Sequence, residues 1–394
     1  MQRVNKEDKD IFNIAIYVHD LVKEIGHSRA MIESLNNIPS EKIKDIYVIS
    51  FSCDKEEIIF RNSPHKVKFY KVPKLFQKPF LIKMLYFYIM SYLIKLFKIP
   101  KDTKHIGIGT AALCVDYVNI QFIQEEWSHL YFKYIKNNFL KTIYKKVLFF
   151  FFIQAEKYLY RIRKDVKFSV LSQFEVDYLK SRFKVDEDRM ILNYSGVNFD
   201  NFSIPEKSRH ETFMELKSKY NDLDKIDPTK PTYLFVGAFE RKGLKYVIEK
   251  VKKIKDSQLI IVGKPESGSY DIKLTDNMAH IPYTKEIEKI YAISDTFVFP
   301  TIYEPFGLVL LEAAVMGLEI YTLTKKVGAS ELLHNLEGVH LFDDLHSLEI
   351  RTNNFLTREM RVSNRKKRKE VFEKYTWEMT GEKFYKLLSS TNLS

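Results

Sequence analysis

Short hydrophobic runs alternate with longer amphipathic stretches along the first half of the chain. Brief apolar runs bounded by polar turns are typical of buried β-strands, and segments with one apolar face are typical of helices. The pattern predicts strands at residues 11–18, 46–50, 66–72, 106–109, 117–121, 166–172 and 190–193. It predicts helices within 19–35 and at 80–97, 130–163 and 174–183. Strands that alternate with helices favour a parallel sheet and an α/β fold.

A polar stretch at residues 198–230 interrupts this alternation, which then begins again. Prolines such as Pro205 and Pro228 mark irregular chain there, so we predict a linker with one helix at 210–220. The second series predicts strands at 232–236, 258–262, 279–282, 296–299 and 319–323. The helices between them are predicted at 243–255, 286–293 and 307–316. This second series predicts a second doubly wound domain.

The domain boundaries follow from the two series. We predict an N-terminal domain of residues 1–203 and a C-terminal domain of residues 204–375, followed by a tail of residues 376–394. A strongly basic helix is predicted at 361–369. The tail predicts an amphipathic helix at 377–388, with its apolar residues near one face.

The composition excludes several classes of protein. With 394 residues, of which 45% are hydrophobic, the chain can bury substantial cores and is not of a disordered type. Two distant cysteines, Cys53 and Cys114, argue against a disulfide scaffold and favour a reducing compartment. The net charge of +12 fits anionic substrates, anionic lipid or nucleic acid, although a general richness in lysine also contributes to it.

One segment raises the question of membrane contact. In residues 79–98, Lys83 and Lys95 enclose only eleven uncharged residues, whereas a membrane span needs about 20, so we predict no transmembrane helix. The charged first twenty residues also lack the apolar core of a signal peptide. Two interpretations of 80–97 stay open: a helix lying in the surface of an anionic membrane, or a buried helix whose lysines reach solvent.

The most informative motif begins where the predicted strand 296–299 ends. Glu304 and Glu312 are separated by seven residues, and Pro305, Phe306 and Gly307 form a turn into the helix that holds Glu312. A helix start offers unpaired N–H groups and the positive end of a dipole, which attract phosphate. Carboxylates beside such a site can accept hydrogen bonds from sugar hydroxyls. A strand, a tight loop and a helix with these residues predict a cradle for a nucleotide diphosphate.

A second motif follows the predicted strand 232–236. Gly237 ends the strand, Arg241 and Lys242 follow, and Gly243 opens a helix. Glycine permits close approach of the backbone, Arg offers a planar fork of donors and Lys offers a mobile point charge. Two cations at a strand end can neutralise a diphosphate leaving group.

Together these motifs resemble those of the family 4 retaining glycosyltransferases. The stretch from Glu304 to Glu312 resembles their E-x7-E motif, and Arg241 and Lys242 occupy the place of their pyrophosphate-binding pair. The turn Gly196-Val197-Asn198 and the strand end Val262-Gly263 are also similar to that family. The resemblance covers most of the chain, is strongest from Leu171 onward, and is closest in pattern to bacterial lipopolysaccharide-core glucosyltransferases.

The resemblance implies the GT-B fold, in which two Rossmann-like domains face each other across a cleft and the C-terminal helix returns to the first domain. It implies catalytic roles for Glu304, Arg241 and Lys242. The donor-binding residues that it implies are Gly237, Arg241, Lys242, Gly263, Tyr283, Glu304, Pro305, Phe306, Gly307, Leu308 and Glu312.

The first domain departs from the family pattern. Relatives often carry a Gly-Gly loop after the first strand, whereas this chain has only Gly26 there. Relatives often place a His after a middle strand, whereas this chain has Gln121, Glu125 and Glu126 in that region. We therefore expect Gly26, Gln121 and Glu125 on the acceptor side, and an acceptor or sugar that differs from those of familiar relatives.

The expected activity is retaining, metal-independent transfer of a hexose from a nucleotide-diphosphate sugar, a UDP-sugar by preference. The expected acceptor is a glycan or a lipid-linked glycan in the synthesis of cell-envelope polysaccharide or lipopolysaccharide. We expect no cofactor, no metal and no nucleic acid as partner. The expected location is the cytoplasm, with peripheral contact at the inner, anionic membrane face. A sugar-nucleotide epimerase of the same fold and a basic nucleic-acid-binding protein are the alternatives.

Overall fold

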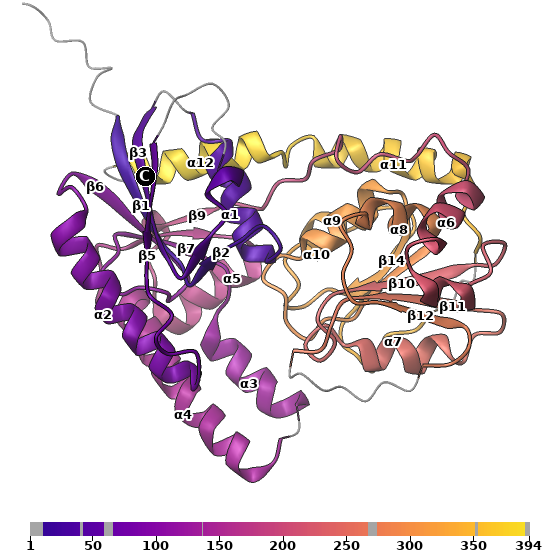
Figure 1. Ribbon diagram of the computed structural model, residues 1–394, viewed down its shortest axis with the longest axis horizontal. Helices are drawn as coiled ribbons and strands as arrows, with labels where there is room; N and C mark the ends of the chain where they lie inside the picture. The colour runs from indigo at the N-terminus through magenta and orange to yellow at the C-terminus, as the bar shows by residue number, and fades with distance from the viewer. Residues whose placement is uncertain are drawn as a thin grey trace, which may run out of the picture. The chain divides into compact units, whose positions relative to one another are not determined.

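The computed structural model of the protein describes residues 11–39, 42–58, 66–135, 137–266, 274–350 and 354–390 (Figure 1). The chain divides into two compact units. Unit 1 comprises Met1–Gly196 and Tyr375–Ser394, and unit 2 comprises Val197–Lys374. The first crossing between the units therefore lies a few residues before the predicted boundary at 203, and the polar stretch predicted as a linker belongs to unit 2.

The described part of unit 1 is built on a parallel sheet of seven strands, in the order β5-β3-β1-β6-β7-β8-β9. The strands are β1 (Phe12–Tyr17), β3 (Ile43–Ser50), β5 (Lys66–Lys71), β6 (Thr103–Ile108), β7 (Tyr117–Ile120), β8 (Lys167–Val170) and β9 (Met190–Leu192). All six residues of β1 are buried, as expected for a central strand covered on both faces. The short strands β2 (Asp20–Leu21) and β4 (Ser52–Cys53) pair separately.

Helices connect these strands. The described helices of unit 1 are α1 (Gly26–Asn36), α2 (Phe80–Lys98), α3 (Gln124–Tyr134), α4 (Phe139–Glu156), α5 (Gln173–Tyr178) and α12 (Trp377–Ser389). The helices α4 and α5 each continue into a short π-helical turn, at Lys157–Ile162 and Leu179–Phe183.

The helical region predicted over 130–163 consists of two helices, and the first begins at Gln124 rather than near Leu130. The chain turns between Tyr134 and Phe139. Ile135 is extended, and the Asn138 side chain caps α4 by accepting a hydrogen bond from the backbone N–H of Lys141. The sequence pattern did not show the break because both helices are rich in aromatic residues and only a few residues separate them.

The helix α2 is longer than the uncharged stretch from which its length was judged. It has 19 residues and continues through both Lys83 and Lys95. By length and composition alone it could cross a membrane, and only 17% of its most apolar window is buried. A lysine inside such a helix is tolerated because its long stem lets the ammonium group reach the polar side.

The C-terminal helix α12 completes the core of unit 1. Phe384, Leu387 and Leu388 are fully buried and belong to the same hydrophobic cluster as β1 and α1. The helices α1 and α12 lie side by side (Figure 1). A Cβ atom on Gly381 would lie 2.1 Å from the carbonyl oxygen of Asn37, so only glycine permits this close approach.

The described part of unit 2 holds a parallel sheet of six strands, in the order β12-β11-β10-β13-β14-β15. The strands are β10 (Thr232–Val236), β11 (Gln258–Val262), β12 (Met278–Ile281), β13 (Thr296–Phe299), β14 (Glu319–Leu323) and β15 (Val339–Phe342). The described α-helices are α6 (Arg209–Lys217), α7 (Leu244–Val251), α8 (Ile287–Ile293), α9 (Leu308–Val315), α10 (Ser330–Leu333) and α11 (Arg358–Phe372). The helix α7 covers one face of the sheet, and α8 and α9 cover the other (Figure 1).

The sequence pattern missed β15 and α10. Each has only four residues, and every residue of the edge strand β15 is only partly buried, so neither gives a clear hydrophobic pattern. The parallel α/β architecture with two sheets, predicted from the alternation, is confirmed.

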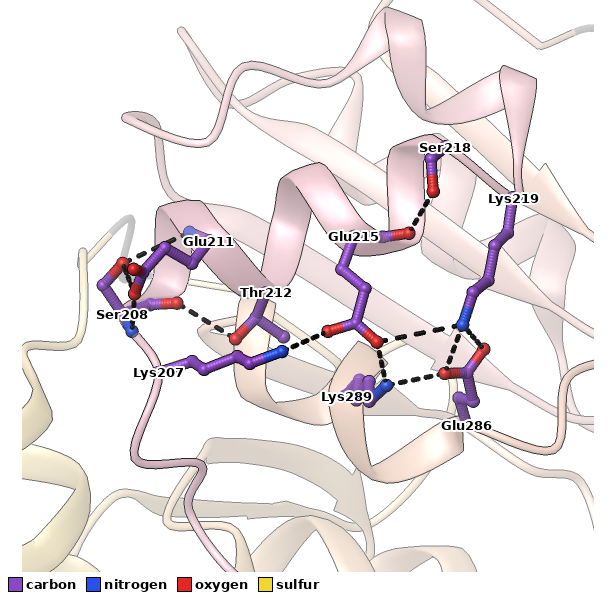
Figure 2. Close-up of polar contacts among 9 residues, drawn as sticks. All are labelled: Lys207, Ser208, Glu211, Thr212, Glu215, Ser218, Lys219, Glu286 and Lys289. Carbon is purple, nitrogen blue, oxygen red and sulfur yellow. Dashed lines mark hydrogen bonds and ion pairs between the residues drawn. The ribbon is translucent and has the colours of Figure 1, made fainter.

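Charged side chains hold α6 against α8 on the surface of unit 2 (Figure 2). Glu215 of α6 contacts Lys289 of α8, and Lys219 bonds Glu286 at 2.8 Å. Ser208 and Glu211 form a capping box that starts α6. Each exposed ion pair adds little stability, but the network fixes where this polar segment docks.

Candidate functional site

The candidate site lies where the strand order of unit 2 reverses. From β10 the chain proceeds outward to β11 and β12, and then returns to β13 on the other side of β10. The loops that leave β10 and β13 therefore diverge at their carboxyl ends, which is where open α/β sheets bind ligands. The first of these loops carries Arg241 and Lys242, and the second carries Glu304.

Two glycines form a flat backbone surface at this edge. Gly237 follows β10 and Gly263 follows β11, and both have positive φ angles, of 143° and 140°. A Cβ atom on Gly263 would lie 2.0 Å from the carbonyl oxygen of Gly237. Both positions therefore require glycine, and the ends of the two strands carry no side chain that could obstruct a ligand.

A third glycine, Gly243, allows the loop after β10 to pack closely against the loop after β13. Gly243 has φ of 79°, and a Cβ atom there would lie 2.4 Å from the carbonyl oxygen of Pro300. The N–H of Ile302 also donates to the carbonyl oxygen of Arg241 at 2.9 Å. The loop with the two cations is thus positioned directly by the loop that leads to Glu304.

The charged side chains of the two loops converge. Arg241 Nη1 lies 3.3 Å from Glu304 Oε2 and donates to the Tyr303 carbonyl oxygen at 2.9 Å. Lys242 Nζ contacts the same Glu304 oxygen, and its ammonium lies 4.9 Å from the centre of the Phe299 ring. On its other side, Arg241 Nε lies 3.4 Å from Glu266. Arg241, Lys242 and Glu304 therefore share one largely buried cluster, and the exposed carboxylate of Glu266 flanks it.

Burial makes the two cations costly in the absence of an anionic ligand. It lowers the pKa of the Lys242 ammonium well below its ordinary value, the nearby Arg241 charge lowers it further, and Glu266 opposes both effects. Burial also lowers the pKa of Arg241, and the nearby carboxylate of Glu266 again opposes this shift. An anion with two or more charges would stabilise both cations, so the electrostatics favour a diphosphate here.

Backbone contacts hold Glu304 rigidly beside the start of α9. Its N–H donates to the Lys326 carbonyl at 2.8 Å, and its own carbonyl accepts from Gly328 at 3.0 Å. Gly307 is the N-cap of α9, with φ of 100°, and among the described residues no side chain accepts a hydrogen bond from the N–H groups at this helix start. Pro305 and the buried Phe306 form the turn between Glu304 and the helix, and Leu308 is its first residue. The α9 start therefore presents N–H groups next to the charged cluster.

The other two donor-side residues differ in exposure. Glu312 lies in α9, is buried, and accepts a hydrogen bond from the Tyr291 hydroxyl at 3.1 Å. Tyr283 follows β12 at the same edge of the sheet, and 53% of it is exposed. Glu312 is thus fixed in one orientation, whereas the Tyr283 ring has an accessible surface that a planar group could stack on.

The acceptor-side candidates lie in unit 1. Gly26 is the first residue of α1, and a Cβ atom there would meet no atom within 4 Å. Gln121 follows β7, and its side-chain amide donates a hydrogen bond to Asn119 at 2.8 Å. Glu125 is buried, and Arg182 and Tyr178 hold its carboxylate at 2.8 and 3.2 Å. The adjacent Glu126 is buried as well. The structure thus gives Glu125 partners within its own unit.

Two residues that the sequence analysis did not single out touch the site. Glu266 faces Arg241, and Tyr291 orients Glu312. Glu266 follows a strand end at the same sheet edge, which was a usable signal, whereas the Tyr291 contact depends on how α8 packs on α9. Among the described residues, no group of three or more His, Cys, Asp or Glu side chains could hold a metal ion.

The part of the chain that contains the candidate site resembles known proteins. Residues 230–354 match the family model "Glycosyl transferases group 1". The chain is 27% identical over 216 residues to an uncharacterized glycosyltransferase of Methanocaldococcus jannaschii, a match that covers 50% of this chain and spans 53% of that relative's length. It is 25% identical over 341 residues to an uncharacterized glycosyltransferase of Haemophilus influenzae, covering 82% and 84% of the two chains.

Solved structures resemble both units. WaaG, a glycosyltransferase involved in lipopolysaccharide biosynthesis, aligns with a TM-score of 0.65 at 15% identity, covering 95% of each chain. HepE of Anabaena, solved with UDP and glucose, aligns with a TM-score of 0.65 at 12% identity, covering 96% of this chain and 99% of HepE. At these identities the likeness concerns the fold, which is the GT-B fold of glycosyltransferases.

The family match and the named relatives together support an enzyme of the hexosyltransferase class. The matched residues 230–354 include the whole charged cluster, Glu312 and Tyr283. The similarity therefore falls on the same part of the chain as the candidate site.

Proposed function

We propose that the protein is a retaining, metal-independent glycosyltransferase that moves a hexose from a UDP-sugar to a glycan or lipid-linked acceptor in the synthesis of cell-envelope polysaccharide, including lipopolysaccharide. One observation carries the proposal: Arg241, Lys242 and Glu304 converge beside the uncapped start of α9. This arrangement combines two cations and a helix dipole for a leaving diphosphate with a carboxylate for the sugar.

Each donor-side residue has a role that its position supports. Arg241 and Lys242 bind the diphosphate, together with the N–H groups near Gly307 and Leu308. Gly237 and Gly263 allow the phosphates to approach the backbone. Glu304 orients the sugar once the donor draws the two cations towards its phosphates.

The nucleoside occupies the outer part of the same sheet edge. Glu312 accepts hydrogen bonds from the ribose hydroxyls, and the exposed Tyr283 ring stacks on the base. Uracil is the proposed base, because HepE was solved with UDP-glucose and with UDP. Pro305 and Phe306 shape the turn that separates the sugar from the phosphates.

The proposed reaction balances without a redox partner. The bond between the sugar C1 and the diphosphate oxygen breaks, and the acceptor hydroxyl oxygen bonds C1 on the same face, so the configuration is retained. The hydroxyl proton passes to a phosphate oxygen of the leaving diphosphate. The two cations and the α9 dipole stabilise the negative charge that develops there. In other enzymes a divalent metal ion stabilises this charge.

The acceptor is proposed to be a glycan that grows on a lipid. WaaG and WaaB, which the fold resembles, are named for lipopolysaccharide biosynthesis and for outer-core galactosyl transfer. Gly26, Gln121 and Glu125 are the acceptor-side residues that we propose. The proposed location is the cytoplasm, at the inner face of the membrane where such acceptors are extended.

Donor binding and slow donor hydrolysis test the proposal. A panel of nucleotide sugars is offered to the parent protein, to Glu304→Ala and to Arg241→Ala, with Lys253→Ala as a control that removes an exposed cation from the same unit. We expect the parent and the control to bind and hydrolyse one donor, and both site variants to fail. A folded parent that binds none of the donors would overturn the proposal.

The same panel separates the alternatives. Conversion of the donor to its epimer without acceptor would assign an epimerase. Retention on nucleic acid that falls steeply with salt, without donor binding, would assign a nucleic-acid-binding protein. Product anomers measured by NMR with a simple acceptor test the retaining stereochemistry.

A further inference from the structure

Two helices of unit 1 expose an apolar surface that the donor site does not use. On α2, the exposed apolar residues besides Phe80, Leu93 and Phe97 are Ile82, Leu85, Ile89, Tyr92 and Leu96. Their spacing of three and four residues places them on one side of the helix. The opposite side, with Met84, Phe87 and Ser91, is buried. The helix is therefore anchored along one stripe and presents a second, apolar stripe outward.

The helix α4 repeats this arrangement beside α2. Its exposed apolar residues, besides the less exposed Phe151, are Phe139, Leu140, Ile143, Val147 and Phe150. The two helices pack through a small cluster that includes Met84 of α2 and Leu148 and Phe152 of α4. Their exposed stripes flank this contact, and the α3–α4 hairpin projects beyond the sheet (Figure 1). We call the five residues of α2 and the five of α4 that form these stripes the α2–α4 face.

The hairpin places its most exposed apolar residues near its tip. Phe139 and Leu140, at the start of α4, are each 77% exposed. Burying such side chains from water is favourable, and a contiguous apolar surface on a folded unit marks a contact site. These two residues are the most exposed of the ten, so they are the ones that gain most from contact with an apolar phase.

The charges around the α2–α4 face have one sign. Residues 66–101 contain nine lysines and no Asp or Glu, and residues 128–155 contain five lysines and no Asp or Glu. Lys98, Lys141 and Lys146 are exposed among them. The one acidic residue of these two helices, Glu156, is fully buried. The face is therefore complementary to a surface that is apolar inside and negative at its rim.

We propose that the α2–α4 face docks unit 1 on the surface of an anionic lipid bilayer, with Phe139 and Leu140 inserted among the acyl chains and the lysines at the headgroups. Amphipathic helices with aromatic and lysine side chains bind membranes in this way. The contact is interfacial rather than spanning, because α2 is anchored to unit 1. Lys95 donates to the Cys114 carbonyl at 2.8 Å, and the Tyr88 hydroxyl donates to the Thr110 carbonyl at 2.8 Å.

The charge pattern favours lipid over a second copy of the chain. A symmetric dimer through this face would bring the same patch of each copy together. Lysines would then meet lysines without an exposed acidic partner on the face, which is unfavourable. Anionic headgroups supply the missing counter-charge along the whole rim.

Vesicle flotation tests the proposal without reference to catalysis. The full chain is mixed with vesicles of phosphatidylcholine alone, or with vesicles that also contain phosphatidylglycerol. We expect flotation with the anionic vesicles, weakening as salt rises. The double substitution Phe139→Ser and Leu140→Ser should lower the bound fraction at least tenfold. The matched control removes exposed apolar side chains from unit 2, with Met360→Ser and Val362→Ser, and should float like the parent.

A charge-reversal pair tests the lysines. Lys141→Glu with Lys146→Glu should abolish flotation with anionic vesicles, whereas Lys253→Glu with Lys366→Glu, which changes the net charge equally, should have little effect. Circular dichroism and donor binding in unit 2 report that each variant is folded, and they separate this proposal from the proposed activity.

Three outcomes would overturn the proposal. The first is a folded parent that does not float with anionic vesicles. The second is a dimer that the Phe139 and Leu140 substitutions dissociate while flotation is absent, which would assign the face to a second copy. The third is retention in the membrane pellet after alkaline carbonate extraction, which would make α2 a spanning helix.

Discussion

Arg241 reaches from the loop after β10 to Glu304 in the loop after β13, with Nη1 3.3 Å from Oε2. The same guanidinium bonds the carbonyl oxygen of the neighbouring Tyr303 at 2.9 Å. The geometry therefore couples the group proposed to hold the diphosphate to the carboxylate proposed to orient the sugar. A donor that engages Arg241 would change the charge that Glu304 experiences.

Replacing Arg241 by Lys should impair catalysis although the charge is kept. A lysine has no planar fork, so it cannot bond Glu304 and the Tyr303 carbonyl together. We expect kcat with the preferred donor to fall by about 100-fold, as when one electrostatic contact to a leaving group is lost. Steady-state kinetics of the variant, with Lys253→Ala as the control, measures this change in kcat. Unchanged kcat would show that Arg241 acts only as a diffuse charge.

Donor binding should weaken as pH rises, because of Lys242. Burial lowers its pKa in the free protein, and a bound diphosphate favours the ammonium and raises the pKa again. Affinity is therefore highest below the lowered pKa and falls as pH rises through it towards the pKa of the complex. Calorimetry with the nucleoside diphosphate across pH measures the effect. In Lys242→Arg the pH dependence should flatten, and a parent without any such dependence would contradict the assignment.

Glu312 should act through donor affinity. Replacing Glu312 with Gln removes the charged acceptor proposed for the ribose hydroxyls, and we expect the donor Kd to rise by about 10-fold or more. Tyr291→Phe leaves the Glu312 carboxylate in place but removes the hydroxyl that bonds Glu312 at 3.1 Å and the Val309 carbonyl oxygen at 3.3 Å, so its effect should be smaller and mostly on KM. The control Glu249→Gln changes an exposed carboxylate on α7. Equal losses in all three variants would exclude a specific ribose contact.

The glycine surface at the sheet edge can be tested by stability. The substitution Gly263→Ala places a Cβ atom 2.0 Å from the Gly237 carbonyl oxygen at a φ of 140°, so the backbone must move. We expect a loss of about 2–4 kcal/mol in the free energy of unfolding. Gly26→Ala, where a Cβ atom meets nothing within 4 Å, should be neutral or slightly stabilising. Urea unfolding of both variants measures the contrast.

Glu156 should make the stability of unit 1 depend on pH. Burial raises its pKa to about 8, although the backbone N–H groups of Gln124 and Glu125, which donate to it at the start of α3, oppose the shift. The folded state then binds more protons than the unfolded state between about pH 4.5 and 8, so stability falls as pH rises through that window, by up to about 1.4 kcal/mol per pH unit.

The substitution Glu156→Gln isolates this titration. The free energy of unfolding of this variant should be close to that of the parent near pH 4.5. As pH rises above that value, the variant should become increasingly more stable than the parent. Urea unfolding at several pH values measures the difference. If the variant instead becomes less stable than the parent as pH rises, the α3 N–H groups stabilise the Glu156 carboxylate as an anion.

Local sequence patterns were sufficient to predict the two α/β series and most of their strands. Buried parallel strands such as β11 are continuous apolar runs, and that signal is local. The sequence also singled out Arg241, Lys242, Glu304 and Gly307, because residues that follow successive strand ends of a parallel sheet must gather at one edge. The GT-B fold expected from the motifs is confirmed by the structural comparison.

Other features depend on contacts between residues far apart in the sequence, so they could be established only from the three-dimensional structure. The break between α3 and α4, the short strand β15 and the pairing of Tyr291 with Glu312 leave no periodic signal. Whether α2 was buried or outward-facing could not be read from its composition, because both interpretations fit the same apolar residues. Packing decided it: one stripe of α2 is anchored in unit 1, and the other remains exposed beside α4.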